Sequence, residues 1–171
     1  MLKLRLDDRP ETVVPDLKIA AQAASRGMEV LIIDHLRKKN GGTSPRAGFP
    51  KSNYYADASK NVSAGSRGSI ATVDVEKDGI ALHYEGGTVY PKKKALAIPI
   101  DPSVAAIWPS EYTGMGHELF KTPAGALGDR ETGQILWLLV PKATIPADPS
   151  VLPSDGQILS AAEDAVWEAV S

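Results

Sequence analysis

Apolar and polar positions first predict a strand and then one long helix. Leu2 to Leu6 alternates apolar and basic residues, a pattern typical of a strand. From about Pro15 to Lys39, apolar residues recur at steps of three and four, which predicts an amphipathic helix. We expect Thr12 to cap this helix and Gly41-Gly42 to end it. Gly27 interrupts the pattern, so we expect a bend or close packing at that position.

The middle of the chain carries its clearest β pattern. A short helix is expected over roughly Ser52 to Val62. After it, Ile70 to Val75 and Ile80 to Tyr84 flank the sequence Lys77-Asp78-Gly79, which predicts a hairpin on an Asp-Gly turn. Leu96 to Ile98 is expected to be a short strand, because Pro99 and Pro102 exclude a central strand beyond it.

The last third of the chain is rich in turn residues and contains two clearly predicted elements, a strand and a helix. Five glycines in residues 110–134 indicate a long excursion with room for another hairpin, and the apolar run 135–140 predicts a buried strand. A proline-rich linker over 141–154 leads to a C-terminal helix at about 155–170, which the capping box Ser154-x-x-Gln157 begins. This order predicts a single α+β domain over 1–171, with an antiparallel sheet packed on the long N-terminal helix. Segments 41–51 and 85–95 are expected to be extended loops or arms.

Composition narrows the function classes. The chain has 171 residues, 43% hydrophobic and 23% charged, as an ordinary globular domain has. A net charge of -2 excludes a globally basic nucleic-acid coat. The absence of cysteine excludes disulfides, thiolate metal sites and a cysteine nucleophile. The longest apolar run is six residues and the first residues are charged, so we expect neither a membrane span nor a signal peptide.

No enzyme is expected from the motifs. His35, His83 and His117 lie far apart in the sequence. His83 and Glu85 would share one face of a predicted strand and could in principle chelate a metal ion. A solvated strand face is the simpler interpretation of this pair. A Gly-x-Ser-x-Gly motif is absent, and Ser63 to Gly68 lacks the context of a nucleophile elbow. Phosphate-binding glycine loops are absent as well. We therefore expect no catalytic residue, metal or cofactor.

Charge is segregated along the chain. Residues 35–60 are rich in Lys and Arg, Lys92-Lys93-Lys94 forms a second basic cluster, and no basic residue follows Lys142. Three interpretations remain open. The basic segments could face nucleic acid, opposite ends of neighbouring copies could meet head to tail and close a ring, or the charges could simply be solvated.

One block of the chain resembles a known family. The sequence from Tyr84 to Ile100, Tyr-Glu-Gly-Gly-Thr-Val-Tyr-Pro-Lys-Lys-Lys-Ala-Leu-Ala-Ile-Pro-Ile, is similar to the signature of phage virion-morphogenesis proteins of Mu-like and related tailed phages. Asn53 to Ala58 resembles the Phe-Trp-x-x-Ala segment of that family. The run 135–140 and the segment 147–153 resemble its ending. The usual bulky aromatic pair is Tyr54-Tyr55 here.

The resemblance implies a non-enzymatic structural protein of the virion neck, active in tail completion, tail termination or head–tail connection. It would form a homo-oligomeric ring, hexameric or dodecameric, between portal-side and tail-tube proteins, after assembly in the host cytoplasm. Non-specific contact with packaged DNA would be a further property. The alternative is a small DNA-binding accessory protein that uses segments 35–60 and 92–94. The candidate subunit or DNA contacts are Arg46, Lys51, Gly86, Gly87, Lys92, Lys93 and Lys94.

Overall fold

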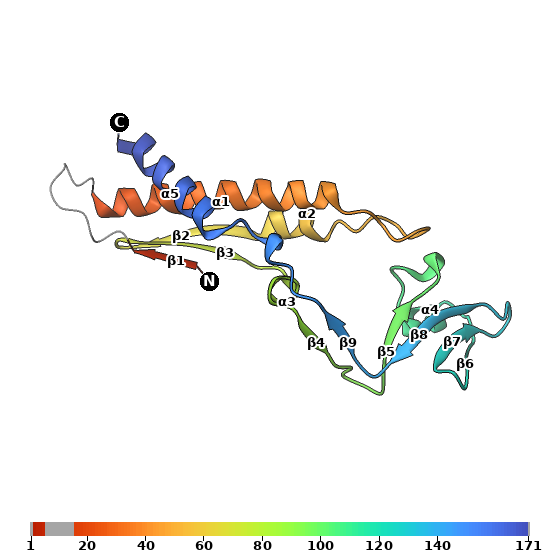
Figure 1. Ribbon diagram of the computed structural model, residues 1–171. Coiled ribbons are helices and arrows are strands. Elements are labelled where there is room, and N and C mark those ends of the chain that lie inside the picture. The colour runs from red at the N-terminus through yellow and green to blue at the C-terminus, as the bar shows by residue number, and fades with distance from the viewer. Residues whose placement is uncertain (1, 6–15, 171) are drawn as a thin grey trace. The chain divides into compact units, whose positions relative to one another are not determined.

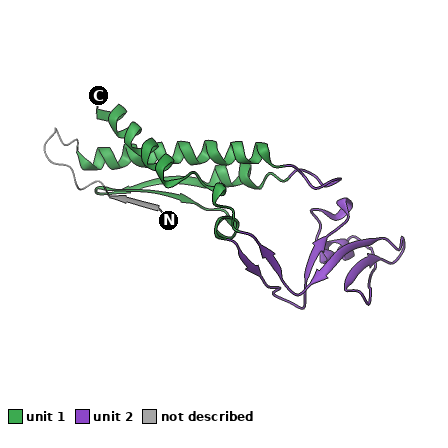
Figure 2. Cartoon of the chain, in the orientation of Figure 1, with its two compact units in different colours: residues 1–43, 52–85, 147–171 green, residues 44–51, 86–146 purple. Residues whose placement is uncertain are grey.

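The computed structural model describes residues 2–5 and 16–170 and has the α+β class that the pattern predicts (Figure 1). The chain forms two compact units (Figure 2). Unit 1 consists of residues 1–43, 52–85 and 147–171, and unit 2 of residues 44–51 and 86–146. Each unit has its own cluster of buried apolar side chains. We expected a single domain over 1–171, and the chain divides into two units instead. It leaves unit 1 after residue 43 and again after residue 85, and each time it returns.

Unit 1 contains a three-stranded antiparallel sheet in the order β1-β3-β2. The predicted first strand is confirmed as β1, Leu2–Arg5, which pairs with β3, Ile70–Val75. On its other edge β3 pairs with β2, Val62–Arg67. A two-residue turn connects β2 to β3, and Gly68 has a φ of +62° there, a conformation that favours glycine. The segment 63–68 is therefore a strand and its turn.

The predicted hairpin between Ile70–Val75 and Ile80–Tyr84 is wrong. The first strand exists as β3, but the second segment forms the short helix α3, Ile80–Glu85. Gly79, with a φ of +83°, leads into this helix, and its carbonyl accepts the N–H of His83 at 3.0 Å. Since β2 and β1 already occupy both edges of β3, a third strand has no edge to pair with along Ile70–Val73. Helical geometry still lets Ile80 pack on the core.

The long helix of unit 1 is confirmed as α1, Leu17–Gly42. Its N-cap is Asp16, whose carboxylate accepts the N–H of Lys18 at 3.0 Å, whereas the expected cap Thr12 lies outside the described residues. The helix includes Gly41 and Gly42 and has Thr43 as its C-cap, so it ends later than predicted. It packs on the sheet and on α5, and its buried residues are Ala20, Ala21, Ala24, Ser25, Met28, Ile32 and Leu36.

Two smaller helical segments and the last helix complete unit 1. The predicted helix at 52–62 is α2, Tyr54–Ala58, continued by the 3₁₀ turn η1, Ser59–Asn61. The C-terminal helix is α5, Asp155–Val170, which packs along α1 (Figure 1). Its capping box is confirmed: the Ser154 N–H donates to Gln157 Oε1 at 3.0 Å, and the Gln157 N–H donates to Ser154 Oγ at 3.4 Å.

Unit 2 contains a four-stranded sheet in the order β5-β8-β7-β6. Its strands are β5, Leu96–Pro99; β6, Leu119–Lys121; β7, Ala126–Asp129; and β8, Ile135–Val140. The predicted strand at 135–140 is thus a central strand, and the excursion over 110–134 contains the hairpin β6–β7. The 3₁₀ turn η2, Pro102–Val104, and the helix α4, Pro109–Gly114, lie between β5 and β6. Val104, Leu136 and Trp137 form the buried core.

A two-stranded antiparallel sheet completes unit 2. It joins β4, Gly87–Val89, to β9, Ala143–Ile145. Part of the expected arm 85–95 is therefore a paired strand, Glu85 ends α3, and Gly86 and residues 90–95 lack regular structure. The expected linker 141–154 likewise contains β9 and the 3₁₀ turn η3, Pro149–Val151.

Candidate subunit-contact surface

All seven candidate contact residues belong to unit 2. Gly86, with a φ of +74°, makes the turn from α3 into β4, and Gly87 is the first residue of that strand. Gly87 pairs with Ile145 and Val89 with Ala143 in the β4–β9 ladder. The two glycines thus position the start of a strand whose second edge is available, since the sheet has only these two strands among the described residues.

The three lysines lie in the connection from β4 to β5. Lys92, Lys93 and Lys94 are all exposed, and within the described residues none of them has an ion pair. Tyr90 precedes them with 68% of its surface exposed. The connection therefore presents an aromatic ring and three cationic amines together, and they remain available for a partner.

Arg46 and Lys51 lie in the other segment of unit 2, the loop 44–51. The Arg46 guanidinium stacks 5.0 Å from the centre of the Phe49 ring. Gly48 has a φ of +79° and lies so close to Pro102 that a Cβ would be 3.1 Å from the proline Cγ. Packing against η2 thus holds this loop, whereas the three lysines belong to the β4–β5 connection. Arg46 and Lys92–Lys94 are in separate parts of unit 2.

Sequence reasoning missed an apolar patch on the sheet of unit 2. Ile98 in β5 pairs with Leu138 in β8, and both are exposed, by 37% and 41%. Trp137, which precedes Leu138, is 1% exposed. Leu138 lies on the opposite side of β8 from Trp137 because strand side chains alternate. Leu136 is nevertheless buried like Trp137, at a register shift in the β7–β8 pairing between Leu127 and Gly128. A continuous apolar run hides this alternation, so the two outward side chains were not recognisable from the run itself.

The two units differ in formal charge. Unit 2 contains eight Lys or Arg residues and five Asp or Glu residues, a formal charge of +3. Unit 1 contains eleven Lys or Arg residues and sixteen Asp or Glu residues, a formal charge of -5. Basic segment 35–39 belongs to the acidic unit, so the segregation is between units and not between the two ends of the chain.

In unit 1 two histidines serve local packing. His83 lies on α3, so it does not share a strand face with Glu85 as the predicted hairpin implied. Its ring stacks on Tyr54 at 4.7 Å between centres, and its Nδ1 lies 3.3 Å from the Tyr55 hydroxyl. His35 Nε2 lies 2.9 Å from the carbonyl oxygen of Ser150. These contacts fasten α3 to α2 and η3 to α1.

An ion pair reinforces the same region. The Lys39 ammonium lies 2.8 Å from Asp148 Oδ2 and donates at 2.8 Å to Ser150 Oγ. The hydrogen bond from Lys39 lowers the pKa of Asp148 from 3.8 to about 2, and hydrogen bonds from Ser150 act in the same direction. Lys39 was one of the basic residues considered for nucleic acid, but the structure gives its charge a partner within unit 1.

The third histidine lies beside a buried carboxylate in unit 2. Asp129 is 1% exposed and accepts the N–H groups of Glu131 and Thr132, at 3.0 and 2.7 Å. The bond from the Thr132 backbone is the largest cause of a lowered pKa of Asp129. His117 Nδ1 lies 3.7 Å away, and its ring stacks on Tyr112, whose hydroxyl donates to Asp129 at 3.1 Å. The cluster holds the β7–β8 loop in place.

The described residues lack a metal-binding cluster and a membrane-spanning helix. Over residues 2–5 and 16–170, no group of three or more His, Asp or Glu side chains is placed to hold a metal ion. In the same part of the chain, no helix has the length and apolarity needed to cross a bilayer. Comparisons with protein-family models, with curated proteins and with solved structures find no match to this chain.

Proposed function

We propose that this chain is a non-enzymatic structural protein of a tailed-phage virion, which assembles as a ring in the neck where head and tail join. The resemblance of the block Tyr84–Ile100 to phage virion-morphogenesis proteins supports this proposal. The opposite formal charges of the two units, -5 and +3, are the observation that carries it. A ring protein needs two different surfaces that fit each other, and this chain has two units of opposite formal charge.

The charge pattern favours a head-to-tail contact between copies. When unit 1 of one copy meets unit 2 of the next, attractive pairs replace the repulsion that two like units would experience. Such a heterologous contact repeats around an axis and closes into a ring if the rotation permits. On this proposal the lysines of the β4–β5 connection and the apolar pair Ile98–Leu138 contribute contacts with neighbouring subunits.

Negative-stain imaging tests the proposal directly. The purified protein is imaged alone, and then after mixing with tails and with DNA-filled heads. We expect closed rings, or added density at the head–tail junction, and the ring symmetry then gives the subunit number. Monomers that attach to neither particle would contradict the proposal.

A second function, a DNA-binding accessory protein, is favoured by one observation. Lys92, Lys93 and Lys94 are exposed and unpaired within the described residues, as non-specific phosphate contacts would be. It predicts measurable DNA affinity at low salt that collapses as salt rises and weakens when the three lysines are changed to alanine. Absence of binding at low salt in a gel-shift titration would remove this alternative.

A further inference from the structure

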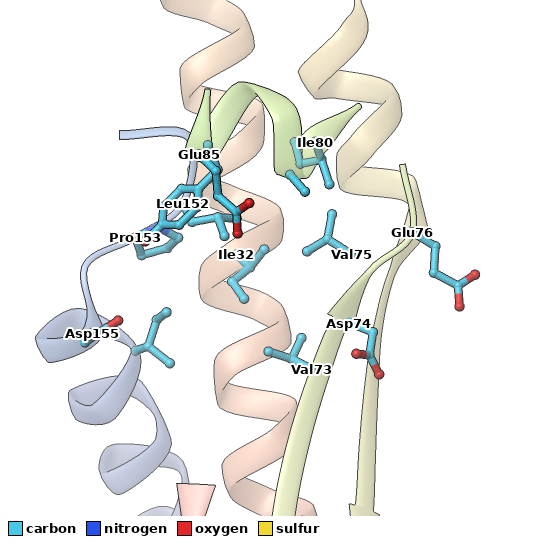
Figure 3. Close-up of a pocket in the computed structure, with 13 residues that line it drawn as sticks. Ile32, Val73, Asp74, Val75, Glu76, Ile80, Glu85, Leu152, Pro153 and Asp155 are labelled. Carbon is cyan, nitrogen blue, oxygen red and sulfur yellow. The ribbon is translucent and has the colours of Figure 1, made fainter. Parts of the chain in front are cut away.

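A groove of about 430 Å³ opens in unit 1 between β3, α3 and the start of α5 (Figure 3). Figure 3 shows Ile32 of α1 between the side chains of β3 and those that precede α5. The apolar side chains that line the groove include Ile32, Val73, Val75, Ile80, Leu152 and Ile158. An apolar floor of this size, partly open to solvent, is suited to the side chains of a bound segment.

Carboxylates lie on both sides of this floor. Asp74 and Glu76 belong to the β3 side, Glu85 ends α3 and Asp155 begins α5. In Figure 3, the Glu85 side chain extends toward the groove, while Asp74 and Glu76 point outward from the β3 side. Among the described residues that line the groove, none is Lys or Arg. The Glu85 carboxylate and the lack of a cation among these described lining residues therefore favour a cationic occupant over an acidic one.

The groove also borders the end of a strand pairing. Among the described residues β1 pairs with β3 only from Ile70 to Val73, so Asp74 and Val75 have no described strand partner on that edge. The Glu76 N–H donates to the carbonyl of Asn61 on the β2 side at 2.8 Å. Because backbone groups alternate between the two edges of an antiparallel strand, Val75 directs its N–H and C=O away from β2, toward that edge. An extended segment lying in the groove can therefore add to the sheet beyond the end of β1.

We infer that this groove receives residues 90–95 of a second copy of the chain, and that this pairing forms the contact between subunits. The inference rests on the proposed function, since it names the surfaces by which copies would join. The segment, Tyr-Pro-Lys-Lys-Lys-Ala, has no regular structure of its own and carries three exposed cations. Its Tyr90, a residue that is 68% exposed, supplies apolar surface for the floor, and its lysines supply counter-charges for the carboxylates that line the groove.

Other basic segments fit the groove less well. Lys39 is already paired with Asp148, and it lies on a helix that cannot add to a strand edge. Arg46 stacks on Phe49 in a loop packed against Pro102. Residues 90–95 combine exposed charge with a non-helical backbone, which strand addition requires.

Disulfide trapping tests the contact itself. The chain has no cysteine, so Glu85→Cys and Lys93→Cys each introduce a single thiol, and a mixture of the two variants can link only between copies. We expect a mixed cross-linked dimer under mild oxidation. The matched controls are Glu163→Cys mixed with Lys93→Cys, and Glu85→Cys mixed with Lys142→Cys, which replace one partner by an exposed residue elsewhere. Equal yields in all three mixtures would overturn the inference.

Charge reversal tests whether the pairing drives association. Lys92→Glu/Lys93→Glu is compared with Lys121→Glu/Lys142→Glu, because all four lysines are exposed in unit 2 and the net charge changes equally. Glu76→Lys/Glu85→Lys is compared with Glu163→Lys/Asp164→Lys in unit 1. We expect the first member of each comparison to weaken self-association by about tenfold or more in sedimentation velocity, and its control by much less. Combining the two contact variants in one chain should restore association.

The outcomes separate the two proposals. Rings that form normally with both contact variants would overturn the groove contact and leave the neck function standing. A protein that remains monomeric at all concentrations and attaches to neither heads nor tails would contradict both. A disulfide that forms preferentially between the Glu85→Cys copy and the Lys93→Cys copy, together with restored association in the combined variant, would support the contact.

Discussion

Gly27 of α1 lies directly against Ala161 of α5. A Cβ added at Gly27 would collide with the carbonyl oxygen of Ala161 and would lie 2.7 Å from the Cβ of Ala165. The glycine therefore lets the two helices of unit 1 approach closely, and this explains why a residue of poor helix propensity interrupts a 26-residue helix. The contact is with backbone, so a side chain at position 27 cannot be accommodated by a rotamer change alone.

We predict that Gly27→Ala destabilises unit 1 by about 1–3 kcal/mol, the usual cost of overpacking, despite the better helix propensity of alanine. Urea unfolding followed by circular dichroism measures the effect. Gly42→Ala is the matched control, because nothing lies within 4 Å of a Cβ at that helical position. It should be neutral or stabilise by up to about 1 kcal/mol. A stabilising Gly27→Ala would show that α1 and α5 do not pack as described.

Lowering the pH should weaken unit 1 through Asp148. The Lys39 hydrogen bond lowers the pKa of this carboxyl from 3.8 to about 2, so its ionised form is favoured in the folded state. The stability that it contributes is present above about pH 4 and is lost as the pH falls from about 4 to about 2. Thermal unfolding over this range should show a steeper decline for the natural chain than for Asp148→Asn. Asp164→Asn, at an exposed position of α5, should keep the natural profile.

Trp137 should report the integrity of unit 2. It is 1% exposed, whereas Trp108 and Trp167 are 65% and 63% exposed. The variant Trp108→Phe/Trp167→Phe should therefore have blue-shifted fluorescence that acrylamide quenches poorly until the chain unfolds. Trp137→Ala should cost about 3–5 kcal/mol, as large-to-small changes of buried aromatic residues do. Trp108→Ala is its matched control and should have a small effect. Ready quenching of Trp137 in the folded protein would contradict the described core.

Self-association of the chain should weaken as salt rises. The proposed contact joins a unit of formal charge -5 to one of +3, and exposed charges are screened over about 10 Å at 0.1 M salt. We expect sedimentation velocity to show fewer oligomers at about 0.5 M than at about 0.05 M sodium chloride, at one protein concentration. Circular dichroism recorded in both buffers should show the same fold. Oligomers that become larger with salt would indicate an apolar contact instead.

Local patterns in the sequence determined most of the elements of this protein. The three- and four-residue spacing over 15–39 is enough to specify α1, because a helix is held by bonds within the segment itself. The Ser154–Gln157 box likewise marks the start of α5, and the apolar run 135–140 marks β8 as a strand. The α+β class follows from these elements and their order.

Tertiary structure alone decided the strand partners, the two units and the use of each charge. Ile80–Tyr84 alternates like a strand, yet β2 and β1 occupy both edges of β3 along Ile70–Val73, and the segment forms α3. Lys39 and Lys93 belong to similar basic runs, but Lys39 pairs with Asp148, 109 residues away, and Lys93 remains exposed. Such outcomes depend on contacts between residues distant in the chain, which spacing along the sequence does not encode.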